Sequence, residues 1–401
     1  MKRVLLLIFS VSFSFLSFCQ AKKNRLDSLL KTLYADQQPG AFITIEQKSK
    51  IIFKQGYGLA NLQTKEKILS STNLNIGSLT KQFTAYSILL LAQQGRLSLN
   101  DKLAKYFPGF NPKTGNSISI QQLLTHSSGI MDHYEHTDTS IVRHATDKDV
   151  LEAVKNLGNT YFIPGSHYRY SNTAYCLLAL IIEKLSGISY NDFIRKNIFE
   201  PLGMKHSAVL KIGSPIYQPA IGYDINGNEK ESHQLDADQS IFFSTEGDGG
   251  IYTSMDDYLK WCNAWQTGIK LNKALIQQAQ SARFLIDSAN QLSYGYGWFV
   301  SEKNKEKIVY HTGSNGGFRA IAFFIPSQHY SVVIFSNRTD INLEDLVQEI
   351  NKLLHVNNKS FTKIESLVSF TDWPIFAPCK EIPLFSTSFK KNWNASDMAL
   401  N

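Results

Sequence analysis

Cysteine is scarce in this chain, with four residues among 401. They stand at positions 19, 176, 262 and 379, and no two have the paired spacing of a zinc site. The first falls in an N-terminal segment that we expect to be removed, and an odd, widely spaced set does not form a disulfide framework. Cys176 and Cys262 lie in apolar, helix-like stretches. We therefore expect both to be buried as small apolar side chains.

Long runs of one charge and several common catalytic motifs are also absent. The 41 basic and 34 acidic residues give a net charge of +7 and are spread along the chain. A nucleic-acid partner would call for a clustered basic stripe, so none is expected. No Gly-x-Ser-x-Gly occurs, which disfavours an α/β-hydrolase, and no phosphate loop or dinucleotide fingerprint appears. We expect no cofactor.

The N-terminus has the pattern of a secretory signal peptide. Lys2 and Arg3 precede an apolar run at 4–18, and small residues stand before a cleavage point after Ala21. The run is short for a membrane span, and bulky Phe18 disfavours a lipoprotein anchored through Cys19. We predict a signal peptide at 1–21 and export to the periplasm or cell envelope of a bacterium. No stable membrane span is expected after cleavage.

Strand patterns gather near the two ends of the chain, and helical patterns lie between them. Alternating segments predict hairpins at 41–61 and 318–337, and apolar periodicity predicts helices at 78–94, 119–125, 147–157, 173–186, 189–198, 255–265 and 343–355. This order predicts an α+β fold, with one antiparallel sheet built from both ends and flanked by helices. We expect a catalytic domain at 22–356, with a mostly helical subdomain inserted at about 80–290. The tail, 357–401, has no usable pattern.

The segment "IGSLTKQFTAYSILLLAQQG" places a serine and a lysine at the start of an apolar helix. Ser78 and Lys81 are three residues apart, so their side chains are neighbours on a helix. Burial and the positive end of the helix both favour a neutral lysine, which would accept the proton of Ser78. The pairs Ser28/Lys31 and Ser388/Lys391 have the same spacing, but neither opens a buried helix. Ser78 is therefore the candidate nucleophile and Lys81 its base.

Two further segments carry candidate site residues. In "YRYSNTAY", Tyr170 offers a phenol that could relay a proton, and Asn172 an amide that could bind Lys81 or a substrate carbonyl. The alternative is a packed aromatic next to a helix cap.

In "VYHTGSNGGF", Gly313 would let a ligand lie close to the backbone, and the N–H groups of Ser314 and Ser78 would bind an oxyanion. His311 and Thr312 would meet a carboxylate or the leaving group. The alternative is a glycine-rich hairpin turn.

Two patterns are set aside. Lys113-Thr114-Gly115 lies in a loop rich in proline, glycine and asparagine with no strand behind it. The loop 126–146 holds four histidines and two aspartates, at 126, 132, 133, 136, 138 and 144. A zinc site needs three or four convergent ligands, and only His133 and His136 are closely spaced. We expect no metal, and we expect this loop and 213–246 to line the substrate pockets.

The three motifs in this order resemble the serine β-lactamase-like family, which includes class C β-lactamases, D-alanyl-D-alanine carboxypeptidases and related esterases. The stretches "GRLSLNDKLAKYFPGF", "ISIQQLLTHSSGI", "EGDGGIYTSMDDYLKW" and "YGYGWFV" are also similar, so the resemblance covers about 35–340. It implies the β-lactamase/transpeptidase-like fold and an acyl-enzyme mechanism. Ser78 would attack, Lys81 would activate it, Tyr170 would pass protons, and Asn172 would position Lys81 and the substrate.

The resemblance departs at one position, because His311 stands where many relatives have lysine. An imidazole would hold a substrate carboxylate more weakly and in a pH-dependent way. We therefore expect an exported serine hydrolase acting on amide or ester bonds, similar to D-alanyl-D-alanine carboxypeptidases or related esterases. A class C-like β-lactamase is one alternative, and a non-catalytic sensor or scaffold that binds penicillin or cell-wall peptide is another. The expected partners are small peptides, β-lactams or esters, with peptidoglycan as a further candidate.

Overall fold

A computed structural model gives the structure of residues 22–136, 144–211, 213–225, 232–234, 243–303 and 305–356. The signal peptide expected at 1–21 and the tail at 357–401 lie outside the described residues. The same holds for Cys19 and Cys379, for the Ser388/Lys391 pair and for Asp138 in the histidine-rich loop.

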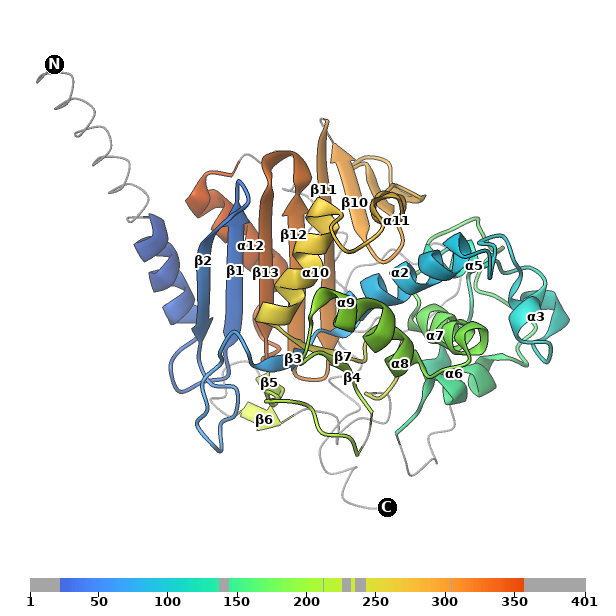
Figure 1. Cartoon of the computed structure of the whole chain (residues 1–401), viewed down its shortest axis with the longest axis horizontal. Helices are drawn as coiled ribbons and strands as arrows, with labels where there is room; N and C mark the ends of the chain where they lie inside the picture. The colour runs from blue at the N-terminus through green and yellow to red at the C-terminus, as the bar shows by residue number, and fades with distance from the viewer. Residues whose placement is uncertain are drawn as a thin grey trace, which may run out of the picture.

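An eight-stranded antiparallel sheet is the centre of the fold (Figure 1), and its strand order is β2-β1-β13-β12-β11-β10-β9-β8. The first hairpin pairs with the last strand, since Ala41 lies opposite Ser336 and Gln47 opposite Tyr330. The α+β fold with a sheet built from both chain ends is therefore confirmed. The strands are β1 (Ala41–Gln47), β2 (Lys50–Tyr57), β8 (Phe284–Asp287), β9 (Leu292–Tyr294), β10 (Phe299–Lys303), β11 (Glu306–Asn315), β12 (Phe318–Ile325) and β13 (Tyr330–Ser336).

One face of the sheet is covered by two helices from opposite ends of the chain. The helix at 22–33 and α12 (Leu343–Leu354) lie on this face, and Asn342 caps α12 by accepting N–H bonds from Glu344 and Asp345. Alternate strand residues such as Ile43 and Ile334 join the same buried cluster. These side chains form one of two cores on either side of the sheet, because strand residues alternate between faces.

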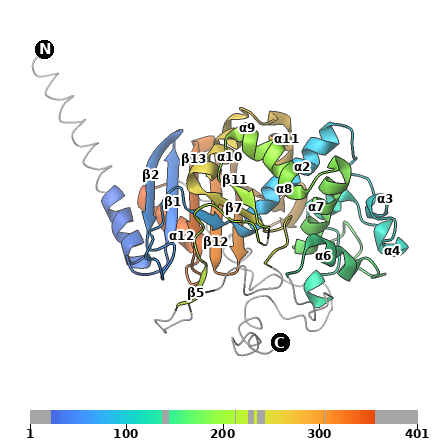
Figure 2. The same ribbon diagram turned by 60° about the horizontal axis from the view of Figure 1, so that its bottom comes forward.

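The other face carries the helices that lie between β2 and β8 in the chain (Figures 1 and 2), and the second core lies there. Phe83 and Trp261 stack within it, with ring centroids 4.1 Å apart. The helices are α2 (Thr80–Gln93), α3 (Leu103–Tyr106), α4 (Pro112–Gly115), α5 (Ile120–Leu124), α6 (Asp147–Val154), α7 (Asn172–Ser186), α8 (Tyr190–Ile194), α9 (Glu200–Leu202), α10 (Met255–Thr267) and α11 (Lys273–Ala279). A three-stranded sheet joins β3 (Asn73–Asn75), β7 (Ile251–Ser254) and β4 (Ala208–Val209), and β5 (Tyr223–Ile225) pairs with β6 (Ser232–Gln234).

Several short elements, among them β3 to β7, α3 and α11, were not expected from the sequence. The strands β8 to β10 were not predicted, because they are only three to five residues long and too short to show periodicity. Lys113-Thr114-Gly115 lies in the one-turn helix α4, which Asn111 caps, rather than in a loop. The boundaries of the helical subdomain, 80–290, remain a prediction.

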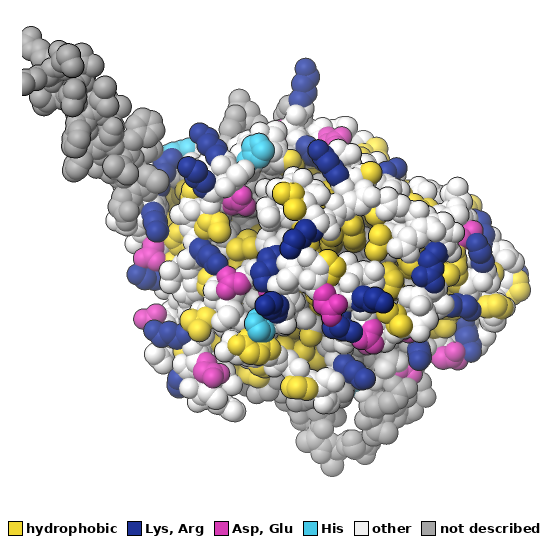
Figure 3. All heavy atoms as spheres, viewed as in Figure 1, with side chains coloured by type: hydrophobic (Ala, Val, Ile, Leu, Met, Phe, Trp, Pro, Cys, Tyr) yellow, Lys and Arg dark blue, Asp and Glu magenta, His cyan; other side chains and the backbone are white. Residues whose placement is uncertain are grey.

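The distribution of surface charge and the composition of the helices are relevant to the expected absence of nucleic-acid and membrane partners. Basic and acidic side chains are interspersed over the face seen in Figure 3. Within the described residues, no single helix has the length and apolar composition to cross a membrane. α7 and the helical segment 190–202 are long and apolar enough only when they are counted together, and the chain bends by 76° between them. In this structure α7 is a core helix, since ten of its side chains are buried.

Candidate active site

Ser78 lies in a short 3₁₀ turn, Gly77–Leu79, that leads into α2 and packs against β11. Gly77 has φ +49°, and a Cβ atom there would lie 2.6 Å from the backbone nitrogen of Ser314. A Cβ on Gly313 would lie 2.1 Å from the carbonyl oxygen of Ile76. Both glycines are needed because the two backbones touch. Gly313 thus permits the close packing of these two backbone segments, which brings the turn that holds Ser78 against the end of β11 that holds Ser314.

Lys81 is fully buried one turn below Ser78. Its Nζ atom donates to three oxygens: Ser78 Oγ at 3.0 Å, Asn172 Oδ1 at 2.8 Å and the carbonyl of Asp248 at 2.8 Å. Burial lowers the pKa of Lys81 to about 8, although the negative charge of Asp248 acts in the opposite direction. A neutral amine keeps two N–H donors for Asn172 and Asp248. Its lone pair then faces the hydroxyl of Ser78, which is the geometry of a general base.

Tyr170 and Asn172 reach this amine from the start of α7. Ser171 caps the helix by accepting the N–H of Ala174, and this orients its two neighbours. The Tyr170 ring centroid lies 4.9 Å from Lys81 Nζ. Burial raises the pKa of Tyr170 well above 10, although a hydrogen bond with Ser78 lowers it. The phenol is therefore protonated at neutral pH and can donate a proton.

His311 differs from its expected role at a substrate carboxylate. Its side chain is fully buried, Nδ1 donates to the Thr312 carbonyl at 2.6 Å, and Nε2 accepts from the Tyr294 hydroxyl at 2.8 Å. Burial first, and Lys81 second, lower the pKa of His311 to about 3. The ring is neutral and both nitrogens are engaged, so it has no atom left for a substrate. Tyr294 lies on β9, a strand that the sequence pattern did not reveal.

A pH experiment tests this corrected position of His311. A histidine with an ordinary pKa would gain affinity for carboxylates as the pH fell through about 6.5, but His311 stays neutral down to about 3. We therefore expect the KM ratio between a peptide with a free C-terminal carboxylate and its amide to stay constant from pH 5 to 8. A carboxylate preference that grows below pH 6.5 would restore the expected contact.

The far end of β11 has a free edge next to Ser78. The pairing of β10 with β11 ends at Phe299 and Tyr310, so residues 311–315 have no strand on that side within the described chain. Ser314 is exposed there. The Thr312 hydroxyl is buried and has no hydrogen-bond partner among the described residues. An extended substrate could pair with this edge, as peptides do with exposed strands.

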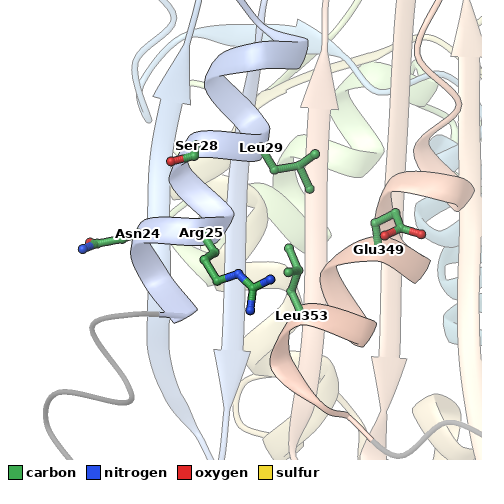
Figure 4. A pocket seen from close by; sticks show the side chains of 6 residues that line it. All are labelled: Asn24, Arg25, Ser28, Leu29, Glu349 and Leu353. Atoms are coloured by element: carbon green, nitrogen blue, oxygen red, sulfur yellow. The ribbon is translucent and has the colours of Figure 1, made fainter.

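The second Ser-x-x-Lys pair lies far from this site. Ser28 lies in a groove between the helix at 22–33 and α12, on the other face of the sheet from α2 (Figure 4). Lys31 is exposed and pairs with Asp27 at 2.7 Å. Exposure keeps such an amine in water, so the pair lacks the burial that lowers the pKa of Lys81.

Several site residues escaped the sequence reasoning. The carbonyl of Asp248 accepts from Lys81, and the hydroxyl of Tyr134 accepts from Asn172 at 3.1 Å. Asp248 lies in "EGDGGIYTS", a stretch that resembles the family. The sequence therefore pointed to this segment, but it did not predict that the Asp248 carbonyl binds Lys81.

Potential metal-ligating atoms come together at one place among the described residues, where those of Asp147, Cys176 and Asp248 lie within 4.8 Å of one another. Asp147 accepts N–H bonds from residues 246 and 247, and the Cys176 thiol donates to Asp248 at 3.4 Å. Burial raises the pKa of Asp147 well above 3.8 and that of Cys176 well above 9. The cluster supports the turn that binds Lys81, because Asp147 accepts two of its backbone N–H groups. The histidines of loop 126–146 do not form such a group in the described part of the chain.

Comparisons with known proteins identify the family of the chain and proteins of similar sequence and structure. A family model described as Beta-lactamase matches residues 26–357. Protein flp of Staphylococcus aureus (strain MW2) is 30% identical over 356 residues, which are 86% of this chain and 69% of that protein. Penicillin-binding protein 4* of Bacillus subtilis (strain 168) is 29% identical over 335 residues, 80% of this chain and 73% of that one. The octameric penicillin-binding protein homologue from Pyrococcus abyssi has a TM-score of 0.73 at 27% identity, covering 84% and 78%.

Proposed function

The chain belongs to the beta-lactamase family, and on that premise we propose that it is an exported serine hydrolase that cleaves amide or ester bonds through an acyl-enzyme. Its substrate class is that of D-alanyl-D-alanine carboxypeptidases or related peptidases and esterases. One observation carries the proposal: a fully buried amine, Lys81 Nζ, lies 3.0 Å from the Ser78 hydroxyl.

The acylation step uses three side chains. Neutral Lys81 takes the hydroxyl proton of Ser78, and Oγ bonds to the substrate carbonyl carbon. The resulting oxyanion is bound by the N–H groups of Ser78 and Ser314. The Tyr170 phenol gives its proton to the leaving nitrogen or oxygen as that bond breaks, and the proton on Lys81 then restores the phenol. The products are the acylated Ser78, the free leaving group and a neutral Lys81.

Deacylation repeats the relay with water. Water takes the place of the leaving group, and its proton passes through Tyr170 to Lys81 as the oxygen bonds to the acyl carbon. The proton then returns to Ser78 Oγ when the acid product leaves. All groups recover their starting state, so no cofactor is required.

The pH dependence of acylation follows from the pKa of Lys81. The active form is the neutral amine, and its pKa is lowered to about 8. We therefore expect kcat/KM to rise about tenfold per pH unit below 8 and to level off above it. Tyr170 does not impose a fall before pH 10, because its pKa is raised. A profile with a limb near pH 6.5, or one that is flat from 6 to 9, would contradict Lys81 as the base.

A substrate panel separates the proposed activity from its alternatives. It contains a D-Ala-D-Ala peptide, a chromogenic cephalosporin, a short-chain aryl ester and a D-amino-acid amide. Turnover of the peptide, ester or amide above the cephalosporin supports the proposal, whereas preferred cephalosporin turnover indicates a β-lactamase. In mass spectrometry with penicillin, a permanent adduct without turnover of any member of the panel indicates the sensor or scaffold.

A further inference from the structure

The turn after α5 holds the segment that leads to Tyr170. Carbonyl oxygens of this turn accept three backbone N–H bonds from residues 161–169. Gly129 accepts from Tyr161 at 2.7 Å, and Ser127 accepts from Gly165 at 2.7 Å. The carbonyl of residue 126 accepts from residue 169 at 2.9 Å. This turn therefore fixes the path of the chain up to the residue before Tyr170.

His126 extends this hold to Tyr170 itself. Its Nδ1 atom accepts the backbone N–H of Ser171 at 3.0 Å. Its ring lies against the Tyr170 ring, with centroids 4.2 Å apart and planes inclined by 31°. One residue thus contacts three consecutive positions, since its carbonyl also binds Arg169. His126 thus contacts the ring face of Tyr170, binds the peptide group that follows it, and binds the N–H of the residue that precedes it.

The local structure of His126 is unfavourable in two respects. It has φ +56°, a left-handed conformation that a non-glycine residue rarely adopts. It is fully buried, and its Nε2 atom has no hydrogen-bond partner within the described chain. Backbone strain and unpaired buried polar atoms gather at functional sites, where the surrounding structure enforces them.

Charge is not what His126 contributes. Burial first, and the charge of protonated Lys81 second, lower its pKa well below 6.5. The ring is therefore neutral at neutral pH, and it acts through contact and hydrogen bonding. Because Nδ1 accepts a hydrogen bond, the ring proton resides on Nε2.

From these contacts we propose that His126 is a positioning residue that aims the phenol of Tyr170 for proton transfer to the leaving group. The inference rests on the proposed function, in which Tyr170 supplies that proton. A phenol displaced by a fraction of an ångström would donate poorly, while Ser78 and Lys81 would remain paired.

The ratio of kcat/KM between esters with good and poor leaving groups tests this role, because a purely structural defect would lower both values equally. A p-nitrophenolate leaves without a proton, whereas a p-methoxyphenolate leaves better when one is supplied. The experiment measures kcat/KM for p-nitrophenyl acetate and p-methoxyphenyl acetate with three variants of His126. His126→Ala removes the acceptor and the ring, and His126→Phe keeps only a ring. His126→Asn places an oxygen near the Nδ1 position and tolerates positive φ.

Two further variants calibrate the experiment. Tyr170→Phe removes the proton donor and sets the full size of the effect. Ile45→Ala in β1 makes a cavity in the core on the other face of the sheet, and it controls for lost stability. Activity is expressed per acylatable site, so that unfolded protein does not count.

We expect Tyr170→Phe and His126→Ala to lower kcat/KM for the p-methoxyphenyl ester by about 100-fold, and for the p-nitrophenyl ester by less than about fivefold. His126→Asn should recover most of the loss and His126→Phe less of it. Ile45→Ala should leave the ratio between the two esters unchanged. If Tyr170→Phe shows selectivity but His126→Ala lowers both esters equally, the positioning role is wrong. If Tyr170→Phe itself shows no selectivity, the proposed proton donor is wrong instead.

Discussion

Ser78→Ala is expected to abolish acylation by penicillin and to lower hydrolysis of every substrate in the panel by about 10⁵-fold or more. The reason is that, in the proposed mechanism, Ser78 Oγ is the atom that bonds to the carbonyl carbon. No other hydroxyl is held by a buried amine in the described chain, where Lys81 is the fully buried lysine. Intact-protein mass spectrometry measures the adduct, and steady-state kinetics measure the turnover.

The chain contains its own matched control for this prediction. Ser28→Ala removes a serine with the same spacing to a lysine, but from the groove between the helix at 22–33 and α12. Its kinetics and its penicillin adduct should equal those of the natural chain. Residual acylation of Ser78→Ala, or a large loss in Ser28→Ala, would show that the nucleophile lies elsewhere.

Lys81→Met is expected to lower kcat/KM by about 10⁴-fold while Ser78 stays in place. Methionine has a similar length and no titratable group, so it keeps the packing and removes the base. The loss leaves Asn172 Oδ1 and the Asp248 carbonyl without their donor, which costs about 1–3 kcal/mol per buried group. The variant should therefore be somewhat less stable but folded, as circular dichroism can verify.

A control variant and a pH profile accompany this prediction. Lys31→Met removes the exposed lysine that pairs with Asp27 and should change neither activity nor stability by a measurable amount. The small residual activity of Lys81→Met should no longer show the limb at about pH 8. A folded Lys81→Met that acylates at the natural rate would remove Lys81 from the mechanism.

Sequence reasoning located the pair Ser78 and Lys81 because their contact is local. Three residues of helical spacing bring the side chains together, and the apolar run around them indicates burial. The same reasoning reached Tyr170 and Asn172 through the helix that they precede. These placements depend on short-range geometry, which the order of residues largely determines.

The role of His311 could not be predicted in this way, because its partner is distant. Tyr294 reaches it from β9, a three-residue strand without a usable pattern. The Asp248 carbonyl is also invisible to motif reasoning, since a backbone oxygen 167 positions away leaves no mark on residue choice. The contact of His126 with Tyr170 is of the same kind. Buried non-local contacts of this sort need the coordinates.

The fold itself was predictable in outline. Alternation in the hairpins at the two ends placed the sheet, and the final helix follows from the pattern of 343–355. The three strands β8 to β10 complete the sheet beyond β11, and the end of β10 leaves the edge of β11 open beside Ser78. One part of the fold that was missed is therefore the part that determines where the edge of β11 is left open.

A direct titration of Lys81 tests the central claim, that its amine is the base for Ser78. The protein is labelled with ¹³C at lysine Cε, the Lys81 resonance is assigned by its loss in Lys81→Met, and its shift is followed by NMR from pH 6 to 11. A midpoint near 8, coinciding with the limb of the acylation profile, is the result that the structure predicts. An amine that remains protonated up to pH 10 or above, in an enzyme that acylates at pH 7, would contradict it.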